Sequence, residues 1–374
     1  MADTLRTHEI MERTNMLSRI ACAAAAFAMI TQSNVRPALA QGADGQIGIL
    51  LAAGDIAECK PKTVTPSSGF RQEETAKLLG EEIAAAKKAG IPVRVLALGD
   101  LAYDKGSEDQ FKCFHNSWGE HKKEMLPVPG NHEYGSPNAK PYFDYFTDNT
   151  LVSESGPKKG TKKGDYSLNF PDKTDFPDKD FRPWHLIALN SARKGPEPEQ
   201  VKWLTSDLKS NDQRCVLAFA HFFAFSSGRH GHEPPDFDPK KPKANLNKAP
   251  VPYKKMVDAF RTLHAHGASL LLSGHDHQFE QFKRQDADRN VVADGLRSFI
   301  VGTGGTTFYS EIYTRHWANS ERFHAKWHGV LKLELFETQY RWQFVPTETA
   351  KKTIPAELTA PSNKEDCNMR KKPS

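Results

Sequence analysis

The sequence predicts a mixed α/β domain in which two β-sheets pack together and helices cover their outer faces. From Ile47 onward, short apolar runs alternate with amphipathic stretches, which is typical of parallel strands joined by crossover helices. The last two apolar runs follow one another with only a short turn between them, which predicts antiparallel strands. Both kinds of pairing are therefore expected in this domain.

The individual elements are predicted from the periodicity of apolar residues. Strand-like runs lie at Ile47–Ala53, Val93–Leu98, Trp184–Leu189, Val216–Ala220, Ser269–Leu272, Phe299–Val301, Val330–Phe336 and Tyr340–Val345. Helix-like stretches lie at Arg71–Ala89, Glu199–Leu208 and Tyr253–His264. Two stretches rich in Pro, Gly and Lys, Ser153–Gly164 and Glu233–Pro252, are expected to be surface loops.

The first forty residues have the features of a secretory signal peptide. Arg19 precedes a short apolar run, Ile20–Ile30, and the segment closes with Ala38-Leu39-Ala40. The apolar run is too short to span a bilayer, which takes roughly 20 apolar residues. We expect cleavage near Gln41 and an exported protein, periplasmic or secreted, that is not attached to a membrane.

The remainder divides into a folded domain and a tail. We predict that residues 41–346 form the domain, and that the polar segment 347–374, which ends in a basic cluster, is flexible. The net charge of +5, from 51 basic and 46 acidic residues, is too small to indicate nucleic-acid binding. It is compatible with small anionic substrates but does not select among them.

Four cysteines remain after residue 40, and export would allow them to form two disulfides by any of three pairings. Cys59 follows Asp55 by four residues and Cys113 follows Tyr103 by ten, so both leave the same end of neighbouring strands. We therefore predict a Cys59–Cys113 disulfide. Cys215 begins its strand at the far end and is a poor partner for either, and the pairing of Cys215 and Cys367 is left open.

Residue types that bind metals follow four of the predicted strands and a further short apolar run, Leu126–Pro129. The segments are Gly54-Asp55, Gly99-Asp100-Leu101-Ala102-Tyr103, Gly130-Asn131-His132-Glu133, His221 and Gly274-His275-Asp276-His277. In open α/β sheets, ligands gather beyond the carboxyl ends of the strands. Each segment alone has an ordinary structural explanation, such as a turn or a helix cap. Their common position at strand ends favours a shared site instead.

The ligand types indicate the metals. Carboxylates, imidazoles and an amide oxygen, without a thiolate, suit Fe, Mn, Zn or Mg. A carboxylate can neutralise two cations at once, and we expect Asp100 to bridge the two metal ions. Two metal ions about 3.5–4 Å apart can activate a bridging water as hydroxide for attack at phosphorus.

These segments resemble, in order and placing, the signature of the calcineurin-like metallophosphoesterases over roughly residues 48–280. Tyr103, three residues after the second Asp, resembles the purple acid phosphatases, where a Tyr replaces a His found two residues after the first Asp in other members. That second position is Ala57 here, which agrees. The resemblance implies a four-layer α/β/β/α sandwich with two mixed sheets. Only residues 41–46 precede the first strand after the predicted cleavage site, so a compact, single-domain member is expected.

The resemblance also implies a role for each residue. Asp55, Asp100, Tyr103 and His277 would hold one metal, typically ferric iron. Asp100, Asn131, His221 and His275 would hold the other, commonly Fe, Zn or Mn. His132 would contact the substrate and act in catalysis, by protonating the leaving oxygen or stabilising the phosphoryl group. His230, nine residues after His221, is a further candidate for substrate binding, although a loop histidine without such a role is also consistent with the sequence.

The sequence therefore predicts a metal-dependent phosphatase that hydrolyses small phosphoric esters, with monoesters as the expected substrates. A phosphodiesterase using the same ligands is one alternative, because the two activities differ in the loops around the metals. A protein that binds phosphorylated ligands without turnover is another. The oligomeric state is not indicated.

Overall fold

The computed structural model describes residues 45–60, 65–147, 164–172, 175, 181–192, 195–232, 253–309 and 316–368. The predicted signal peptide and most of both predicted surface loops lie outside these residues. Within the described part of the chain, none of the helices is long and apolar enough to span a membrane.

The first sheet has the strand order β13-β12-β11-β1-β2-β3. Its parallel strands are β1 (Gly48–Ala53), β2 (Val93–Ala97) and β3 (Met125–Pro127), and α2 (Gln72–Lys88) joins β1 to β2. β11 (Gly329–Leu335) pairs antiparallel with β1 and with β12 (Gln339–Pro346). The antiparallel pairing predicted for the last two apolar runs is thereby confirmed.

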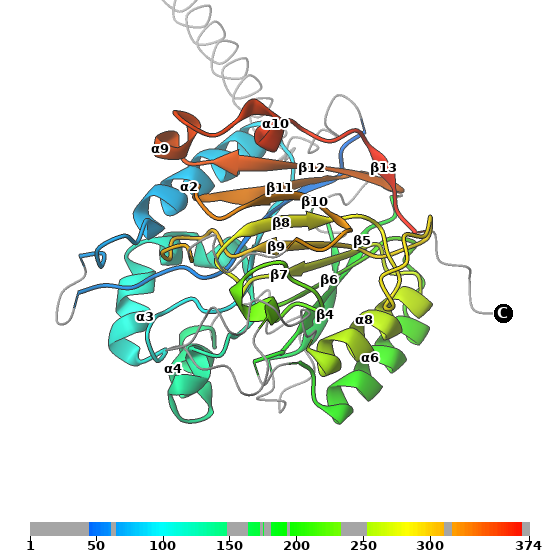
Figure 1. Cartoon of the computed structure of the whole chain (residues 1–374), viewed down its shortest axis with the longest axis horizontal. Coiled ribbons are helices and arrows are strands. Elements are labelled where there is room, and N and C mark those ends of the chain that lie inside the picture. The colour runs from blue at the N-terminus through cyan, green and yellow to red at the C-terminus, as the bar shows by residue number, and fades with distance from the viewer. Residues whose placement is uncertain are drawn as a thin grey trace, which may run out of the picture. The chain divides into compact units, whose positions relative to one another are not determined.

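The second sheet has the strand order β10-β8-β9-β7-β6-β5-β4 (Figure 1). Strands β5, β6, β7 and β9 are parallel, whereas β4 pairs antiparallel with β5, and β8 pairs antiparallel with both β9 and β10. Their bounds are β4 Tyr166–Phe170, β5 Trp184–Leu189, β6 Val216–Ala220, β7 Leu270–Ser273, β8 Phe279–Phe282, β9 Arg297–Val301 and β10 Ser320–His324. Helix α6 (Pro198–Ser210) joins β5 to β6, and α8 (Lys254–Ala265) precedes β7.

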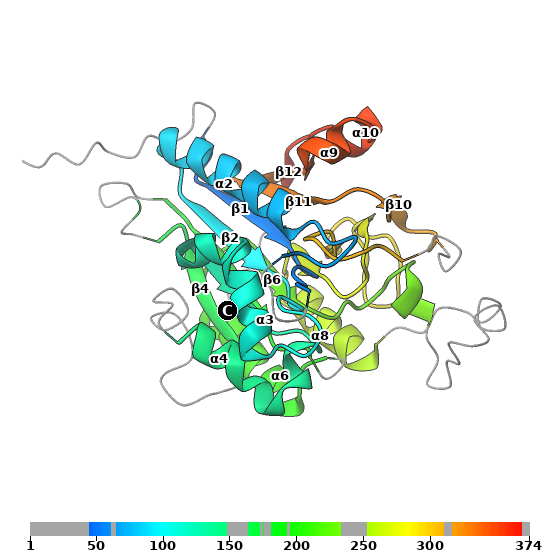
Figure 2. The ribbon, with the colours of Figure 1, turned by 90° about the vertical axis from the view of Figure 1, so that its left-hand side faces the viewer.

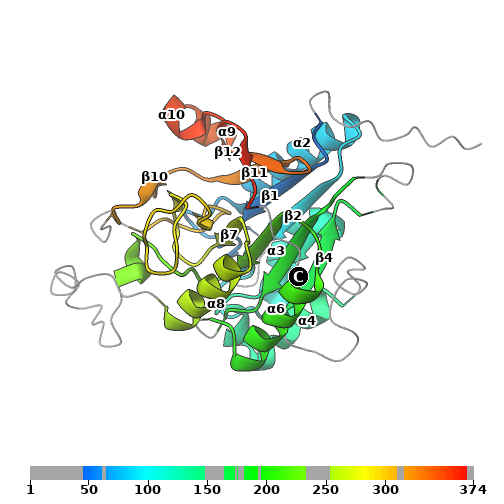
Figure 3. The ribbon, with the colours of Figure 1, turned by 90° about the vertical axis from the view of Figure 1, so that its right-hand side faces the viewer.

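The two sheets pack face to face between layers of helices. Figures 2 and 3 show α2 outside the first sheet, with α6 and α8 beyond the second. Along β6, Leu217 and Phe219 belong to the core cluster shared with the first sheet, whereas Val216 and Ala218 pack in the cluster that contains α6 and α8. Alternate residues of a strand point to opposite faces, so β6 is buried on both. The predicted α/β/β/α sandwich is confirmed.

Two disulfides join distant parts of the domain. The predicted Cys59–Cys113 bond is present, with Cα atoms 5.8 Å apart. Cys113 lies on α3 (Glu108–His115), a helix that the sequence analysis did not predict and that α4 (Lys140–Tyr145) accompanies. The second disulfide joins Cys215, just before β6, to Cys367, with Cα atoms 5.5 Å apart.

The prediction of a flexible tail from residue 347 is wrong for residues 347–368. This segment forms α9 (Glu348–Lys351), α10 (Ala356–Thr359) and β13 (Glu365–Asp366), and β13 pairs antiparallel with β12. The Glu365 carboxylate accepts a 2.8 Å hydrogen bond from Arg297 and a 3.1 Å bond from the Tyr340 hydroxyl. These partners lie far away in sequence, so local composition gave no sign of them. Residues 369–374 lie outside the described residues.

The Cys215–Cys367 disulfide should contribute strongly to stability, because its cysteines are 152 residues apart. Loop-closure entropy for a crosslink of that span predicts a loss of about 4 kcal/mol or more in the free energy of unfolding when both cysteines are replaced by serine. Urea unfolding of Cys215→Ser/Cys367→Ser against wild type measures this loss. Unchanged stability, or free thiols in native wild-type protein, would contradict the pairing.

Candidate metal centre

The candidate ligands lie where both sheets present the carboxyl ends of their parallel strands. Asp55 and Asp100 follow β1 and β2, whereas His221 and His275 follow β6 and β7. Asp55, Asp100 and His275 have positive φ values of 61°, 50° and 73°. Such a backbone conformation costs of order 1–3 kcal/mol for a residue with a side chain and often marks a functional site. The strained turns direct these side chains into the junction between the sheets.

Glycines make room for this crowding. A Cβ atom on Gly130 would lie 2.1 Å from Asp100 Oδ1, and one on Gly274 would lie 2.7 Å from Asp55 Oδ2. Any larger residue at either position would displace a carboxylate.

A first group of side chains surrounds the Tyr103 hydroxyl. This oxygen lies 3.0 Å from Asp55 Oδ1, 3.3 Å from Asp100 Oδ2 and 3.3 Å from His277 Nε2. His277 Nε2 is also 3.6 Å from Asp55 Oδ1. The four residues predicted to hold the first metal are therefore brought together.

A second group surrounds His221 Nε2. This nitrogen lies 3.2 Å from Asp100 Oδ2, 3.1 Å from Asn131 Oδ1 and 3.2 Å from His275 Nδ1. One ligand atom each of Asp100, His221 and His275 lies within 4.8 Å of the other two, a spacing that a single ion can bridge. The four residues predicted to hold the second metal are thus also neighbours, and Asp100 Oδ2 belongs to both groups.

Hydrogen bonds outside the centre orient the imidazoles. His221 Nδ1 lies 2.9 Å from the Leu98 carbonyl oxygen, and His277 Nδ1 lies 2.8 Å from that of Thr307. Each Nδ1 can donate to its carbonyl, which leaves an Nε2 lone pair facing the centre, as metal-binding histidines require. His275 is reversed: its Nε2 meets the Tyr253 hydroxyl at 3.3 Å, and its Nδ1 faces inward.

The carboxylates are fixed in a similar way. Asp55 Oδ2 accepts the His275 backbone N–H at 2.9 Å, and Asp100 Oδ1 accepts the His132 backbone N–H at 2.9 Å. The second oxygen of each carboxylate faces the candidate ligands described above. The donor set, its orientation and its convergence therefore fit two cations that share Asp100.

The electrostatics of the buried groups also fit cations. Burial raises the pKa of Asp55 to about 7, and the neighbouring Asp100 adds to the effect. Burial opposes protonation of His221, but the Asp100 carboxylate outweighs it and raises the pKa of His221 to about 9. A positive charge thus stabilises this acidic cluster. Metal binding would release the His221 proton, because imidazole binds a metal through an unprotonated nitrogen.

His132 lies at the entrance to the centre. Its side chain is 28% exposed, and its Nε2 is 3.8 Å from Asp100 Oδ2. Its Nδ1 lies 2.6 Å from the Asp104 carbonyl oxygen, which fixes the ring against Tyr103. The exposed Nε2 edge can therefore meet a bound substrate while the rest of the ring is held.

His230 lies beside the same centre. Its ring stacks on His275, with centroids 4.4 Å apart, and its Nε2 is 3.0 Å from the Tyr309 hydroxyl. The backbone N–H of His230 donates to Asp276 Oδ1 at 2.9 Å. The structure therefore brings this loop histidine next to the predicted metal ligands.

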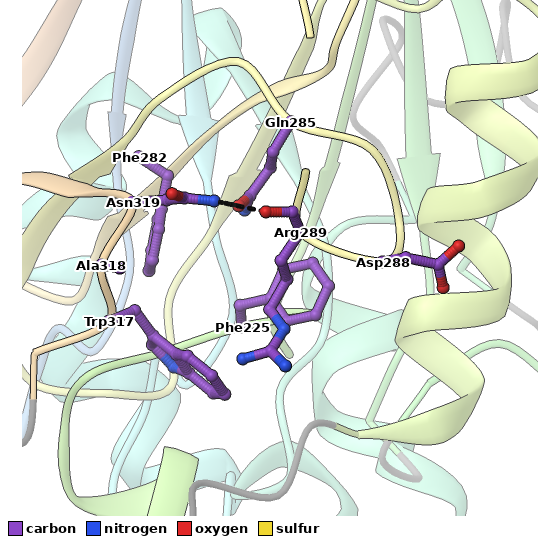
Figure 4. Close-up of a pocket in the computed structure, with 8 residues that line it drawn as sticks. All are labelled: Phe225, Phe282, Gln285, Asp288, Arg289, Trp317, Ala318 and Asn319. Carbon is purple, nitrogen blue, oxygen red and sulfur yellow. Dashed lines mark hydrogen bonds between the residues drawn. The ribbon is translucent and has the colours of Figure 1, made fainter. Parts of the chain in front are cut away.

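The loop that bears His230 is supported from behind. Trp317 donates its indole N–H to the Ser226 carbonyl oxygen at 2.8 Å and its backbone N–H to Ser227 Oγ at 2.9 Å. Trp317 also lines a pocket of about 180 Å³ with Phe225 and Arg289, and the Arg289 guanidinium lies 4.0 Å from the Trp317 ring centroid (Figure 4). No candidate ligand lines this pocket, so it is separate from the metal centre.

Glu133 supports the centre and was given no role by the sequence analysis. Its buried carboxylate accepts backbone N–H groups from Gly130 at 2.7 Å, Asp100 at 2.9 Å, Leu101 at 2.9 Å and Ala102 at 3.1 Å. One side chain thus ties the turn after β2 to the turn after β3. Its only signal in the sequence is its place directly after Asn131 and His132, which also suits a helix cap.

Comparison with known proteins agrees with this site. The sequence model of the calcineurin-like phosphoesterase family matches residues 49–279. No curated protein sequence matches the chain. Among solved structures, the chain is similar to purple acid phosphatase PPD1 from yellow lupin (Lupinus luteus) seeds, with a TM-score of 0.59, 14% identity, and coverage of 82% of this chain and 53% of that one.

Two further structures share the fold. GAP50, the anchor in the inner membrane complex of Plasmodium, has a TM-score of 0.52 and 14% identity, and the match covers 87% of this chain and 90% of GAP50. PhoD has a TM-score of 0.52 and 11% identity, with coverage of 88% and 71%. This chain spans about half the length of the lupin phosphatase.

The family match extends over more than half of the chain, which therefore belongs to the calcineurin-like phosphoesterases. The predicted superfamily is confirmed, and the three residues Asp100, His221 and His275, which lie close enough together to hold a metal ion, fall within the matched residues.

Replacing Glu133 tests whether this carboxylate holds the ligand turns together. Glu133→Gln keeps the shape but directs an amide N–H₂ toward backbone donors. We expect the free energy of unfolding to fall by about 2–3 kcal/mol, and metal content to fall with it. Urea unfolding and elemental analysis measure both. The exposed Glu120→Gln is the control, and normal metal content in Glu133→Gln would contradict the role.

Proposed function

We propose that this protein is a purple acid phosphatase-like enzyme that hydrolyses small phosphoric monoesters at a centre of two metal ions. The observation that carries the proposal is the sharing of Asp100 Oδ2 between two groups of oxygen and nitrogen ligands, 3.3 Å from the Tyr103 hydroxyl and 3.2 Å from His221 Nε2.

In this proposal Asp55, Asp100, Tyr103 and His277 hold ferric iron, and Asp100, Asn131, His221 and His275 hold Fe, Zn or Mn. These ligand types suit such ions, and all four cysteines of the described residues are in disulfides rather than at the centre. When bound, the two ions would supply an activated bridging hydroxide as the nucleophile and would neutralise charge on the phosphoryl oxygens.

Side chains of the protein would orient the ester and donate a proton to its leaving oxygen. His132, held by the Asp104 carbonyl oxygen, would present Nε2 to the leaving oxygen as a proton donor or to the phosphoryl group as a hydrogen-bond donor. His230 approaches from the other side, where its ring covers His275. A substrate held between them would contact donors on two sides.

Two alternatives remain distinct from this proposal. A phosphodiesterase would use the same ligands, so only its substrate preference would differ. A binding protein without turnover would keep the fold, and the similarity to GAP50, described as an anchor, illustrates that the fold alone does not decide. The complete set of seven converging ligands, together with His132, supports catalysis, because binding alone does not need a shared carboxylate beside a proton donor.

Asp100→Asn tests the proposed catalysis directly. Wild-type protein should hydrolyse 4-nitrophenyl phosphate faster than bis(4-nitrophenyl) phosphate, and the substitution should lower kcat/KM for both by about 100-fold or more, because an amide neutralises cations poorly. Asp109→Asn, at an exposed position of α3, is the matched control. A wild-type protein that binds phosphate without turnover would favour the binding protein, and a preference for the diester would favour the phosphodiesterase.

Tyr103 determines the proposed subtype. Burial, with the adjacent Asp55 and Asp100 carboxylates, raises the pKa of the Tyr103 phenol, and only a strong neighbouring cation would favour its anion. Iron-loaded wild type should therefore show a visible phenolate-to-iron charge-transfer band, which Tyr103→Phe should abolish. Absorption spectra with iron analysis measure this. A colourless iron-loaded wild type, or a band that persists in Tyr103→Phe, would contradict the assignment of Tyr103 as an iron ligand.

A further inference from the structure

The imidazoles of His275 and His277 are each covered by another ring. His230 stacks on His275, and Tyr309 stacks on His277 with centroids 4.2 Å apart and an angle of 13° between the planes. The two covering residues are joined, since the Tyr309 hydroxyl lies 3.0 Å from His230 Nε2. Tyr309 follows β9 and had no role in the sequence analysis.

Two phenols approach the same nitrogen in different ways. The hydroxyls of Tyr103 and Tyr309 both lie 3.3 Å from His277 Nε2. The Tyr103 ring is perpendicular to the imidazole, and its hydroxyl also contacts the Asp55 and Asp100 carboxylates. The Tyr309 ring is nearly parallel to the imidazole, so its hydroxyl lies above the imidazole plane, whereas an imidazole binds a metal within that plane. Tyr309 therefore borders the centre without occupying a ligand position.

The Tyr309 ring is held in place by both neighbours. The His277 ring lies against it on one side, and the Arg229 guanidinium lies 4.9 Å from its ring centroid. A phenol has an ordinary pKa near 10 and keeps its proton at neutral pH, so the hydroxyl can donate a hydrogen bond. The third phenol near the ligands is not equivalent, because Tyr253 meets the outward-facing Nε2 of His275.

The Tyr309 hydroxyl could distinguish substrates by the number of their non-bridging phosphoryl oxygens. A phosphomonoester has three non-bridging oxygens and a diester has two. His132 stands on the Asp100 side of the centre, and the Tyr309–His230 pair stands on the His275 and His277 side. A hydrogen-bond donor on the His275 and His277 side therefore strengthens binding of a monoester, which has the third non-bridging oxygen, more than binding of a diester.

We propose that Tyr309 contacts the substrate directly, donating a hydrogen bond to the third non-bridging oxygen of a phosphomonoester, and so selects monoesters over diesters. This inference rests on the proposed phosphatase function and deepens it. Tyr309 is in this sense a specificity-determining residue, and inorganic phosphate, which keeps all such oxygens, should bind through the same contact.

Tyr309→Phe tests the proposal, because it removes the hydroxyl and keeps the stacked ring. We expect kcat/KM for 4-nitrophenyl phosphate to fall about tenfold, which corresponds to the loss of roughly one hydrogen bond. The value of kcat/KM for bis(4-nitrophenyl) phosphate should change less than about threefold. The dissociation constant of inorganic phosphate, measured by calorimetry on metal-loaded protein, should rise by a similar factor. Equal losses for both esters, or unchanged phosphate affinity, would overturn the proposal.

A second background separates direct contact from an effect through His230. In His230→Ala protein, direct contact predicts that Tyr309→Phe still lowers phosphate affinity, whereas disappearance of the effect would make Tyr309 only a positioning residue and overturn the proposal. Tyr145→Phe, which removes a hydroxyl that contacts His115, controls for the loss of a phenol elsewhere. A wild type without phosphatase activity would refute the proposed function, whereas an active wild type with a silent Tyr309→Phe would refute this inference alone.

Discussion

The arrangement of the centre depends on the Asp100 carboxylate, which joins the two groups of candidate ligands. It is buried between the two sheets, with one oxygen held by the His132 backbone N–H and the other shared by Tyr103 and His221. Asp55 and Glu133 are also buried close by, and burial raises the pKa of each carboxyl to about 7. Carboxylates this close together in a site of low polarity repel one another unless cations or hydrogen-bond donors compensate them.

The fold supplies that compensation in two ways. Four backbone N–H groups converge on Glu133, so its charge is satisfied by the turns that it holds together. The charges of Asp55 and Asp100 instead face imidazole nitrogens and the Tyr103 hydroxyl, a set of ligands that suits metal ions. The disulfides reinforce the surroundings: Cys59–Cys113 ties the turn after β1 to α3, and Cys215–Cys367 fixes the C-terminal segment to the start of β6.

Much of this arrangement could be predicted because the candidate metal ligands follow apolar strands, and strand ends are conspicuous in sequence. The ligand positions, the parallel strands, α2 and the first disulfide all depend on such local signals. Strand β8 (Phe279–Phe282) was missed because Glu280 and Gln281 are buried polar residues that hide its strand character. The segment after residue 346 was mistaken for a tail because its anchors, Cys215 and Arg297, are remote in sequence. Glu133 and Tyr309 were not recognised because their roles depend on partners that only the folded chain brings near.

The metal stoichiometry of the purified protein tests the central claim most directly, namely that one carboxylate joins two metal sites. Elemental analysis of protein saturated with iron or zinc and freed of excess ion should give two ions per chain. With two iron ions, magnetic measurements should show coupling between them, because the Asp100 carboxylate would join the two sites. One ion per chain at saturation, or two ions without coupling, would contradict a shared role for Asp100.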